Sequence, residues 1–264
     1  MFADFMVNTW VAATVVAVVA GMVGMFVVMR GASFAAHALP LGTFPGAAAA
    51  NVLGLNPVAC LLAFALLGVA GISQLGRSER HEVATALTLT VLLGLGALFL
   101  SMTTAYAQAV EALLFGQILG VTRGELLALL AASVAELGLL AVLFRPLLLD
   151  SVSTELAAVR RVSSRGMEVL FLLMLALATS VALPVVGALL VFSLMVGPAS
   201  AARALTDRPI RAMVLSAVLA VVVVWVSVAL AFLSDWPIGF FVGAFGAVAY
   251  AAGRVWLRGG LASG

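Results

Sequence analysis

Long apolar runs, each close to the length that a helix needs to cross a bilayer, follow one another through most of this chain. A spanning helix needs about 20 apolar residues. Such runs occupy residues 9–29, 57–75, 83–104, 125–144, 169–185, 212–233 and 237–256. Hydrophobic residues make up 65% of the 264 residues and charged residues only 9%, whereas soluble domains carry about 25% charged residues. We therefore predict an all-α, polytopic integral membrane protein with a single transmembrane domain over residues 1–264.

Two further apolar segments carry residues that can interrupt a helix. The segment 34–55 contains Pro40, Gly42, Pro45 and Gly46, so we predict a broken second helix of the kind found at transport sites. The segment 186–203 is either a full span or a half-helix that turns back. The prediction is therefore nine spans, or eight. The less apolar segment 105–125 predicts a loop with a short surface helix.

Arginine is the only basic residue type besides histidine, and it collects at alternate ends of the apolar runs. The arginine-bearing ends are at Arg30, 77–80, 145–165, 203–211 and 254–258, and the opposite ends carry Asp4, Glu111 and Asp235, with Arg123 as an exception. The positive-inside rule predicts that the arginine ends are cytoplasmic. With nine spans, the N-terminus lies outside and the C-terminus in the cytoplasm. Because Asp4 replaces a basic n-region, we expect the first run to be a mature span rather than a cleaved signal.

Several activities are excluded by residues that the chain does not contain. Without lysine it can form neither a Walker A nucleotide site nor a Schiff base. The single Cys60 can form no internal disulfide, and no HExxH, CxxC, GxSxG or GxGxxG motif occurs. The arginines are not interleaved with aromatic residues, which argues against nucleic-acid binding. We expect a protein that is not an enzyme.

His37 and Glu136 are the ionisable residues that stand out within the spans, where such groups are costly and often functional. An imidazole is a common ligand for zinc-like ions, so His37 can be a ligand on a transport path. Alternatively, it is a packed histidine that donates to a backbone carbonyl freed by a nearby proline. Glu136 can be a carboxylate on the path, or a neutral side chain at a helix contact.

Four stretches together resemble the permease subunits of bacterial ABC transporters for zinc and manganese. They are "FVVMRGASF", "LLFGQILGVTRGEL", "LLLDSVSTELAAV" and "VGALLVFSLMVGPASAARAL". The second is similar to the family's Phe-Gly loop followed by a Thr-x-x-Glu-Leu helix start. The last, the most specific, is similar to a Val-Gly-x-Leu-Leu-Val run ending in Pro-Ala-x-x-Ala-Arg. The resemblance extends over about residues 10–256.

The resemblance includes a departure at the family's metal path. The family pattern reads Ser-x-x-x-Asp-x-x-x-His-x-x-x-Pro-Gly, with the Asp and His on one helix face. An ungapped match on Ser33 and Pro45-Gly46 places His37 where the family has Asp and Leu41 where it has His. Another register matches "HALPLG" to the family's His-Ala-x-x-Pro-Gly and requires a one-turn insertion.

The resemblance implies a permease of an ATP-driven importer that works by alternating access at a homodimer axis in the bacterial plasma membrane. The transported zinc or manganese would bind transiently, with no permanent cofactor. Partners would be a cytoplasmic ATPase subunit and an extracytoplasmic metal-binding protein. Contact with the ATPase would fall in 197–209, at Pro198, Ala199, Ser200, Arg203, Asp207 and Arg208. The alternatives are a secondary transporter driven by an ion gradient, and a structural membrane anchor.

Overall fold

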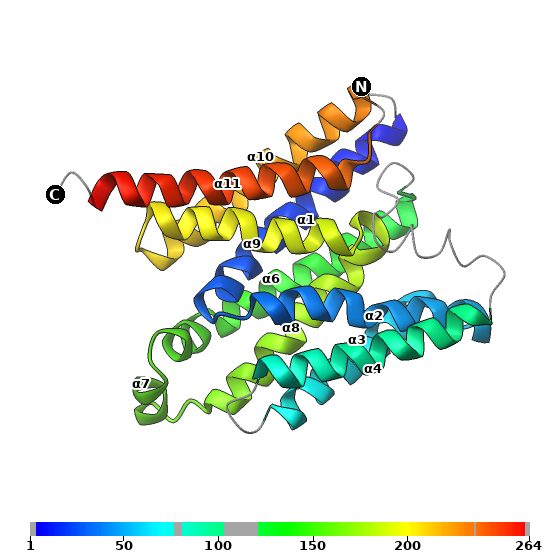
Figure 1. Ribbon diagram of the computed structural model, residues 1–264, viewed down its shortest axis with the longest axis horizontal. Helices are drawn as coiled ribbons and strands as arrows, with labels where there is room; N and C mark the ends of the chain where they lie inside the picture. Colours follow the sequence, from blue (N-terminus) through cyan, green and yellow to red (C-terminus); the bar gives the residue numbers. More distant parts are fainter. Residues whose placement is uncertain (1–3, 77–80, 103–120, 235, 262–264) are drawn as a thin grey trace.

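In the computed structural model, the described elements are α-helices that run mostly along the long axis of the molecule (Figure 1). The structure describes residues 4–76, 81–102, 121–234 and 236–261. Within these ranges the helices are α1 (Asp4–Met29), α2 (Ser33–Leu53), α3 (Pro57–Leu75), α4 (His81–Ser101), α6 (Arg123–Val152), α7 (Thr154–Val159), α8 (Ser164–Val186), α9 (Ala188–Leu205), α10 (Pro209–Ser234) and α11 (Ile238–Leu261). The predicted all-α class is confirmed. Most of the segment 105–125 lies outside the described residues.

Two helix starts follow directly from local sequence. Asn56 caps α3, because its Oδ1 accepts from the backbone N–H groups of Val58 at 2.9 Å and Ala59 at 3.2 Å, and Pro57 occupies the first turn, where no N–H is needed. Thr122 and Glu125 form a reciprocal capping box at the start of α6. The Thr122 backbone N–H donates to Glu125 Oε2 at 2.8 Å.

The prediction of a broken second helix is wrong, since α2 is continuous from Ser33 to Leu53 across Pro40 and Pro45. Each proline removes one backbone donor, yet both rings are buried against neighbouring helices. The Thr43 hydroxyl donates to the Pro40 carbonyl at 2.7 Å. Tertiary packing thus holds the helix together where local propensity favours a break.

The apolar run 125–144, the fifth span when 34–55 is counted, predicts a helix that stops at Arg145. This prediction is wrong. α6 continues through Arg145 and Pro146 to Val152. Arg145 is exposed, so its charge stays accessible while the backbone hydrogen bonds continue. A charged residue ends the apolar run, but it does not end the helix.

Six described helices have the length and hydropathy needed to cross a membrane. They fall within α1, α3, α4, α6, α10 and α11, and α9 contains a shorter apolar stretch, Leu190–Leu205. The predicted count of eight or nine spans stays a prediction.

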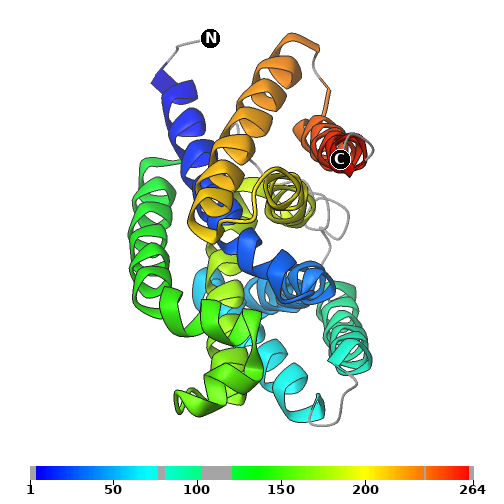
Figure 2. The same ribbon diagram turned by 90° about the vertical axis from the view of Figure 1, so that its left-hand side faces the viewer.

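α9 lies at the centre of the packing, between α1, α10 and α11, and Figure 2 shows it end-on among its neighbours. Glycines bring the backbones unusually close there. A Cβ on Gly24 of α1 would collide with the backbone of Met195 in α9, and one on Gly197 would lie 2.7 Å from the backbone oxygen of Gly246 in α11. Side chains are therefore excluded from the closest contacts of α9 with α1 and α11.

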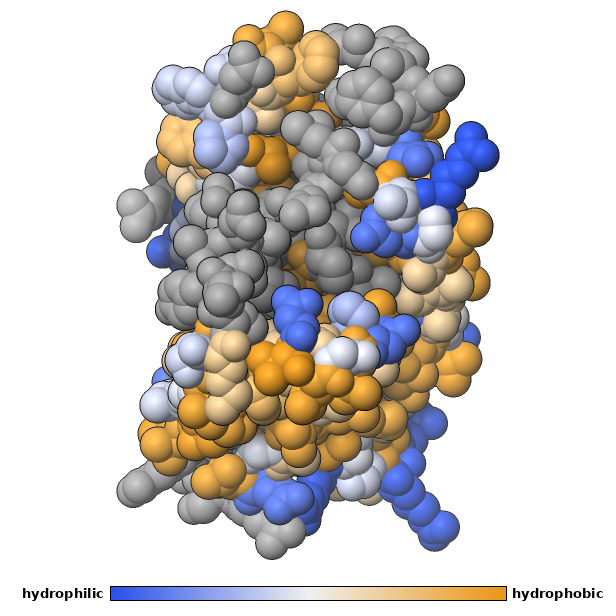
Figure 3. Space-filling view, turned by 90° about the vertical axis from the view of Figure 1, so that its right-hand side faces the viewer, coloured by the Kyte–Doolittle hydropathy of each residue, from blue (hydrophilic) through white to orange (hydrophobic). Residues whose placement is uncertain are grey.

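The arginine-bearing segments gather at one end of the molecule. The α1–α2 turn, α7, the α9–α10 turn and the end of α11 all lie toward the left of Figure 1. The start of α1, the α2–α3 turn and the α10–α11 turn lie toward the right. Viewed from that right-hand end, the visible described surface carries large orange, hydrophobic areas together with several groups of blue side chains (Figure 3).

Candidate transport path

The turn before α2 is fixed by its backbone. Gly31 has φ +64°, a left-handed conformation that glycine adopts without strain, and the Ala32 N–H donates to the Val27 carbonyl at 2.9 Å. This arrangement ends α1 and starts α2 within three residues. The register of α2 is therefore set relative to α1.

One side of α2 is buried and the other forms a narrow, partly accessible stripe. The buried side is built mostly of small residues and packs against α3 and α4, with further contacts to α8 and α9. Most of the residues that are not buried recur at helical spacing along a single face, although Leu41, Phe44 and Ala47 among them also pack against neighbouring helices. We call them the α2 stripe: Ser33, His37, Leu41, Phe44, Ala47 and Asn51.

His37 therefore lies on the accessible face of α2. Its ring contacts Phe192 of α9 edge-on, with the ring centroids 4.7 Å apart and the planes at 65°. Among the described residues, no hydrogen bond or ion pair to the His37 side chain is present. The alternative in which His37 donates to a carbonyl freed by a proline is not seen, and the imidazole nitrogens remain available to a ligand.

Leu41, one turn after His37, lies on the same stripe. The sequence register that places His37 and Leu41 at the family's Asp and His positions therefore puts both on one accessible helix face, as that pattern requires. Leucine offers no ligand atom, so of this pair only His37 carries an atom that can bind a metal ion.

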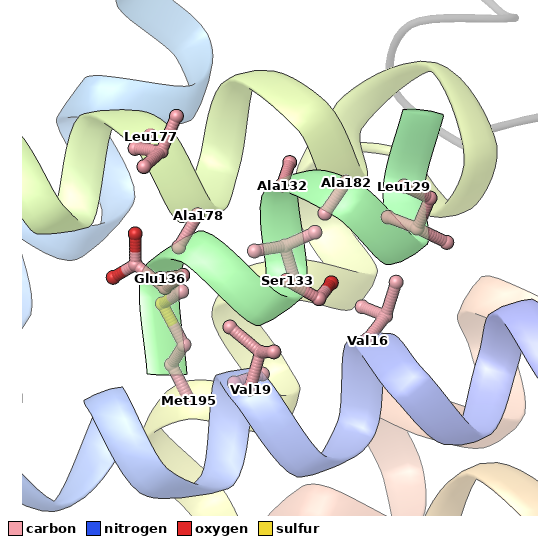
Figure 4. Close-up of a pocket in the computed structure, with 12 residues that line it drawn as sticks. Val16, Val19, Leu129, Ala132, Ser133, Glu136, Leu177, Ala178, Ala182 and Met195 are labelled. Atoms are coloured by element: carbon pink, nitrogen blue, oxygen red, sulfur yellow. The ribbon is translucent and has the colours of Figure 1, made fainter. Parts of the chain in front are cut away.

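Glu136 occupies a different environment, sealed between α1, α6, α8 and α9. The residue is 1% exposed, and neither carboxylate oxygen has a hydrogen-bond partner among the described residues. In Figure 4 the carboxylate points toward Ala178 of α8, while the Ser133 hydroxyl points the other way. The cavity around it is otherwise lined by apolar residues.

The space beside Glu136 is small. Its free volume is about 10 Å³, which is close to the minimum for one water molecule. An ionised carboxylate without a partner is very costly in such surroundings, so the geometry favours a neutral Glu136. No described interaction connects Glu136 with His37.

The remaining predicted path residues belong to the buried side of α2. Pro40, Gly42, Pro45 and Gly46 are all buried. A Cβ on Gly46 would lie 2.6 Å from the carbonyl oxygen of Cys60 in α3, so this glycine permits a close helix crossing. These four residues shape the packing around the stripe: Gly42 and Gly46 lie on the far side of the helix from His37, whereas Pro40 is one turn from it.

The described residues contain no cluster of three or more His, Cys, Asp or Glu side chains able to hold a metal ion. A protomer thus presents His37 without a second ligating side chain nearby in the described part of the chain. This arrangement suits brief contact with an ion rather than a closed structural site, which for zinc takes four ligands.

The predicted ATPase-contacting residues divide into two groups. Pro198 and Ala199 are buried within α9, and Ser200 and Arg203 are half-buried. Asp207 and Arg208 are exposed in the turn between α9 and α10, at the arginine end of the molecule. Only the end of this segment is therefore accessible to a partner.

Sequence reasoning missed two interactions that join distant parts of the chain. One is the contact of His37 with Phe192. The other is an ion pair in which Arg30 Nη1 donates to Asp150 Oδ2 at 2.8 Å. Asp150, an acidic residue among arginines at the same end, was the available sequence signal for the second.

Comparison with known proteins identifies the family. The model of the ABC 3 transport family matches residues 2–253. The chain belongs to this family. The membership predicted from the four sequence stretches is thereby confirmed.

Curated relatives cover most of the chain at low identity. The manganese import system permease protein ScaB of Streptococcus parasanguinis is 28% identical over 200 residues, covering 75% of this chain and 71% of the relative. The high-affinity zinc uptake system membrane protein ZnuB of Buchnera aphidicola is 23% identical over 232 residues, covering 86% and 88%. The relatives therefore include proteins named for each of two metals.

Solved structures show the same fold. PsaBC from Streptococcus pneumoniae, in complex with Fab, superposes with a TM-score of 0.86 at 24% identity, over 96% of this chain and 91% of that one. A metal-chelate type ABC transporter in an inward-facing conformation gives a TM-score of 0.73 at 16% identity, over 92% and 85%. The helix arrangement of this chain is thus the same as in these two structures.

Proposed function

We propose that this chain is the membrane permease subunit of an ATP-driven importer for a divalent transition metal, zinc or manganese. The observation that carries the proposal is the match to the ABC 3 transport family over residues 2–253. Relatives named for manganese and for zinc support the substrate class. The plasma membrane is the proposed location, in keeping with the six apolar helices.

The α2 stripe is the proposed lining of the metal path. Its open side would face a second copy of the chain, so that two His37 side chains approach one another across a homodimer axis. Two imidazoles hold an ion more weakly than a four-ligand site. Weak binding suits a path, because an ion that binds too tightly does not leave.

Energy would come from a separate subunit. The chain has no lysine and so no Walker A site, which makes a cytoplasmic ATPase subunit the proposed partner. Its docking surface would include Arg203, Asp207 and Arg208 at the arginine end. An extracytoplasmic metal-binding protein would deliver the ion at the opposite end.

Reconstituted transport tests this function. The permease, co-purified with its ATPase and placed in proteoliposomes with the binding protein, should accumulate zinc or manganese only when ATP is supplied on the ATPase side. Uptake by the chain alone, driven by an ion gradient without ATP, would establish a secondary transporter instead.

Orientation is tested separately by thiol labelling. After replacement of Cys60, cysteines are introduced at Ser163 before α8 and at Ser234 at the end of α10, two exposed positions. An impermeant reagent added to intact cells should label position 234 and leave 163 unlabelled, which would place the arginine end and the C-terminus in the cytoplasm. The reverse pattern would invert the proposed orientation.

A further inference from the structure

Arg30 lies in the turn between α1, which ends at Met29, and α2, which carries His37. Its backbone N–H donates to the Phe26 carbonyl at 2.9 Å, and the left-handed Gly31 follows at once. α2 begins three residues later, at Ser33. Any displacement of Arg30 relative to its surroundings is therefore transmitted directly to the start of α2.

The side chain of Arg30 connects this turn with two other helices. Its Nη1 donates to Asp150 Oδ2 at 2.8 Å and to the Ser151 hydroxyl at 3.3 Å, both near the end of α6. Its guanidinium carbon lies 5.3 Å from the ring centroid of Phe171 in α8, within the range of a cation–π contact. One side chain thus joins the α1–α2 turn to α6 and α8.

Asp150 lies just before an exposed element. Ser153, three residues later, ends α6 through its N–H, which donates to the Leu149 carbonyl at 3.0 Å. Its hydroxyl accepts from the Leu156 N–H at 3.2 Å and so caps α7. α7 presents exposed apolar residues at the arginine end, with Val159 79% exposed. A movement of α7 is therefore passed to Asp150 through one short, hydrogen-bonded connection.

The pair is buried but not closely packed on all sides. The Asp150 side chain is 2% exposed and that of Arg30 is 14% exposed. The second oxygen of Asp150, Oδ1, is buried without a hydrogen-bond partner among the described residues. Both residues line an open cavity of about 790 Å³, with both polar and apolar walls, that also contacts Glu82 and Arg165. The pair therefore has an unsatisfied acceptor and free space beside it, so a second arrangement is sterically open to it.

We propose that the Arg30–Asp150 pair positions α2 in response to α7, so that docking of the proposed ATPase subunit at the arginine end, against α7, moves the helix that bears His37. Arg30 and Asp150 are positioning residues and do not contact the ion. The proposal rests on the proposed function and adds the connection between the ATPase-facing end and the path. It requires two arrangements of one bistable contact, which is the physical basis of coupling between distant sites.

The connection itself can be tested on the chain alone, without metal or ATPase. Spin labels at Val159 of α7 and Leu53 of α2, two exposed positions, report the distance between the two elements by double electron–electron resonance after replacement of Cys60. The intact pair should give one narrow distribution, and Arg30→Gln or Asp150→Asn should broaden it. A control pair at Val222 of α10 and Val248 of α11 should be unchanged. Equal widths with and without the pair would overturn the proposal.

The consequence for transport is tested in the complex with its ATPase. The number of metal ions imported per ATP hydrolysed should fall by about fivefold in either single variant, the lower range of coupling between sites. The exchanged pair, Arg30→Asp with Asp150→Arg, should recover part of the loss. Glu82→Gln, in the same cavity, is the matched control and should leave the ratio unchanged.

The outcomes separate this proposal from the proposed function. Unchanged ion-to-ATP ratios in both single variants overturn the coupling role while wild-type transport stands. If the wild-type complex imports no metal with ATP, the proposed function fails, and the spin-label distances still decide whether the pair connects α7 and α2.

Discussion

His37 and Glu136 look alike in the sequence, and the structure places them in opposite environments. Each is an ionisable side chain within a long apolar run. His37 is half-buried on the α2 stripe, against Phe192. Glu136 is enclosed by four helices, without a partner among the described residues. The presence of an ionisable residue in a membrane span therefore does not show its environment. The helix face on which it lies decides whether the side chain is accessible or enclosed.

The difference arises from what surrounds each residue on its own helix. α2 carries mostly small residues on its buried side and the polar side chains Ser33, His37 and Asn51 on the stripe, so its faces are distinct. α6 is apolar around most of its circumference, which gives no signal of the side that α1, α8 and α9 cover. The sequence left two environments open for His37 and two for Glu136, and in each case the packing of the neighbouring helices was needed to describe the surroundings.

The largest expected contrast is in folding. Glu136→Arg places a charge in a sealed apolar cavity, where its effective cost is several kcal/mol, and it should abolish the monodisperse protein peak in size-exclusion chromatography of detergent extracts. His37→Arg should accumulate at close to wild-type levels, because the stripe leaves the side chain a route to water. Equal losses in both variants would remove the distinction between the two sites.

Metal transport should be sensitive to substitution at His37 rather than at Glu136, which is the reverse of the expectation for folding. His37→Ala removes the proposed ligand of the stripe and should lower ATP-driven metal uptake by roughly tenfold, equivalent to about 1.4 kcal/mol. Expression and association with the ATPase should be retained. His37→Asp restores the residue type of the family pattern and should keep part of the uptake. Radioactive zinc or manganese uptake into proteoliposomes measures both, and normal uptake by His37→Ala would show that His37 only packs.

The smallest effect is expected for an uncharged replacement at the enclosed site. Glu136→Gln preserves the size and neutrality that the cavity favours, so both uptake and thermal stability should stay close to wild type. Glu136→Ala leaves a larger void and should cost about 1–3 kcal/mol of stability, measured as a lower midpoint of thermal unfolding in detergent. If Glu136→Gln abolishes uptake while the protein stays folded, the carboxylate belongs to the metal path after all.

Much of the fold could be predicted because its signals are local. Apolar runs of bilayer length predicted most of the helices, and the Thr-x-x-Glu-Leu pattern predicted the start of α6 at Thr122. The errors came from treating local signals as sufficient. Pro40 and Pro45 remain inside a helix because neighbours hold it, and α6 continues beyond Arg145 because charge and helix propensity are separate properties.

The site was predicted less completely because its contacts are long-range. His37 stood out in the sequence, but its neighbour Phe192 comes from a helix more than 150 residues away. Arg30 and Asp150 are 120 residues apart, and each alone reads as an ordinary charge at the end of a span. A single sequence does not show which residues far apart in the chain come into contact in the fold.

The glycine contacts of α9 determine how the molecule can change shape. Where two backbones touch without side chains between them, there is no intervening layer that can repack. α1, α9 and α11 should therefore travel as one rigid body through the transport cycle. The described glycines of α2 make no such backbone contact with α9; α2 meets α9 through side chains, among them the rings of His37 and Phe192. That aromatic contact then lies on the sliding boundary between the rigid body and the path helix, and the ion would pass beside the surface where the two parts separate.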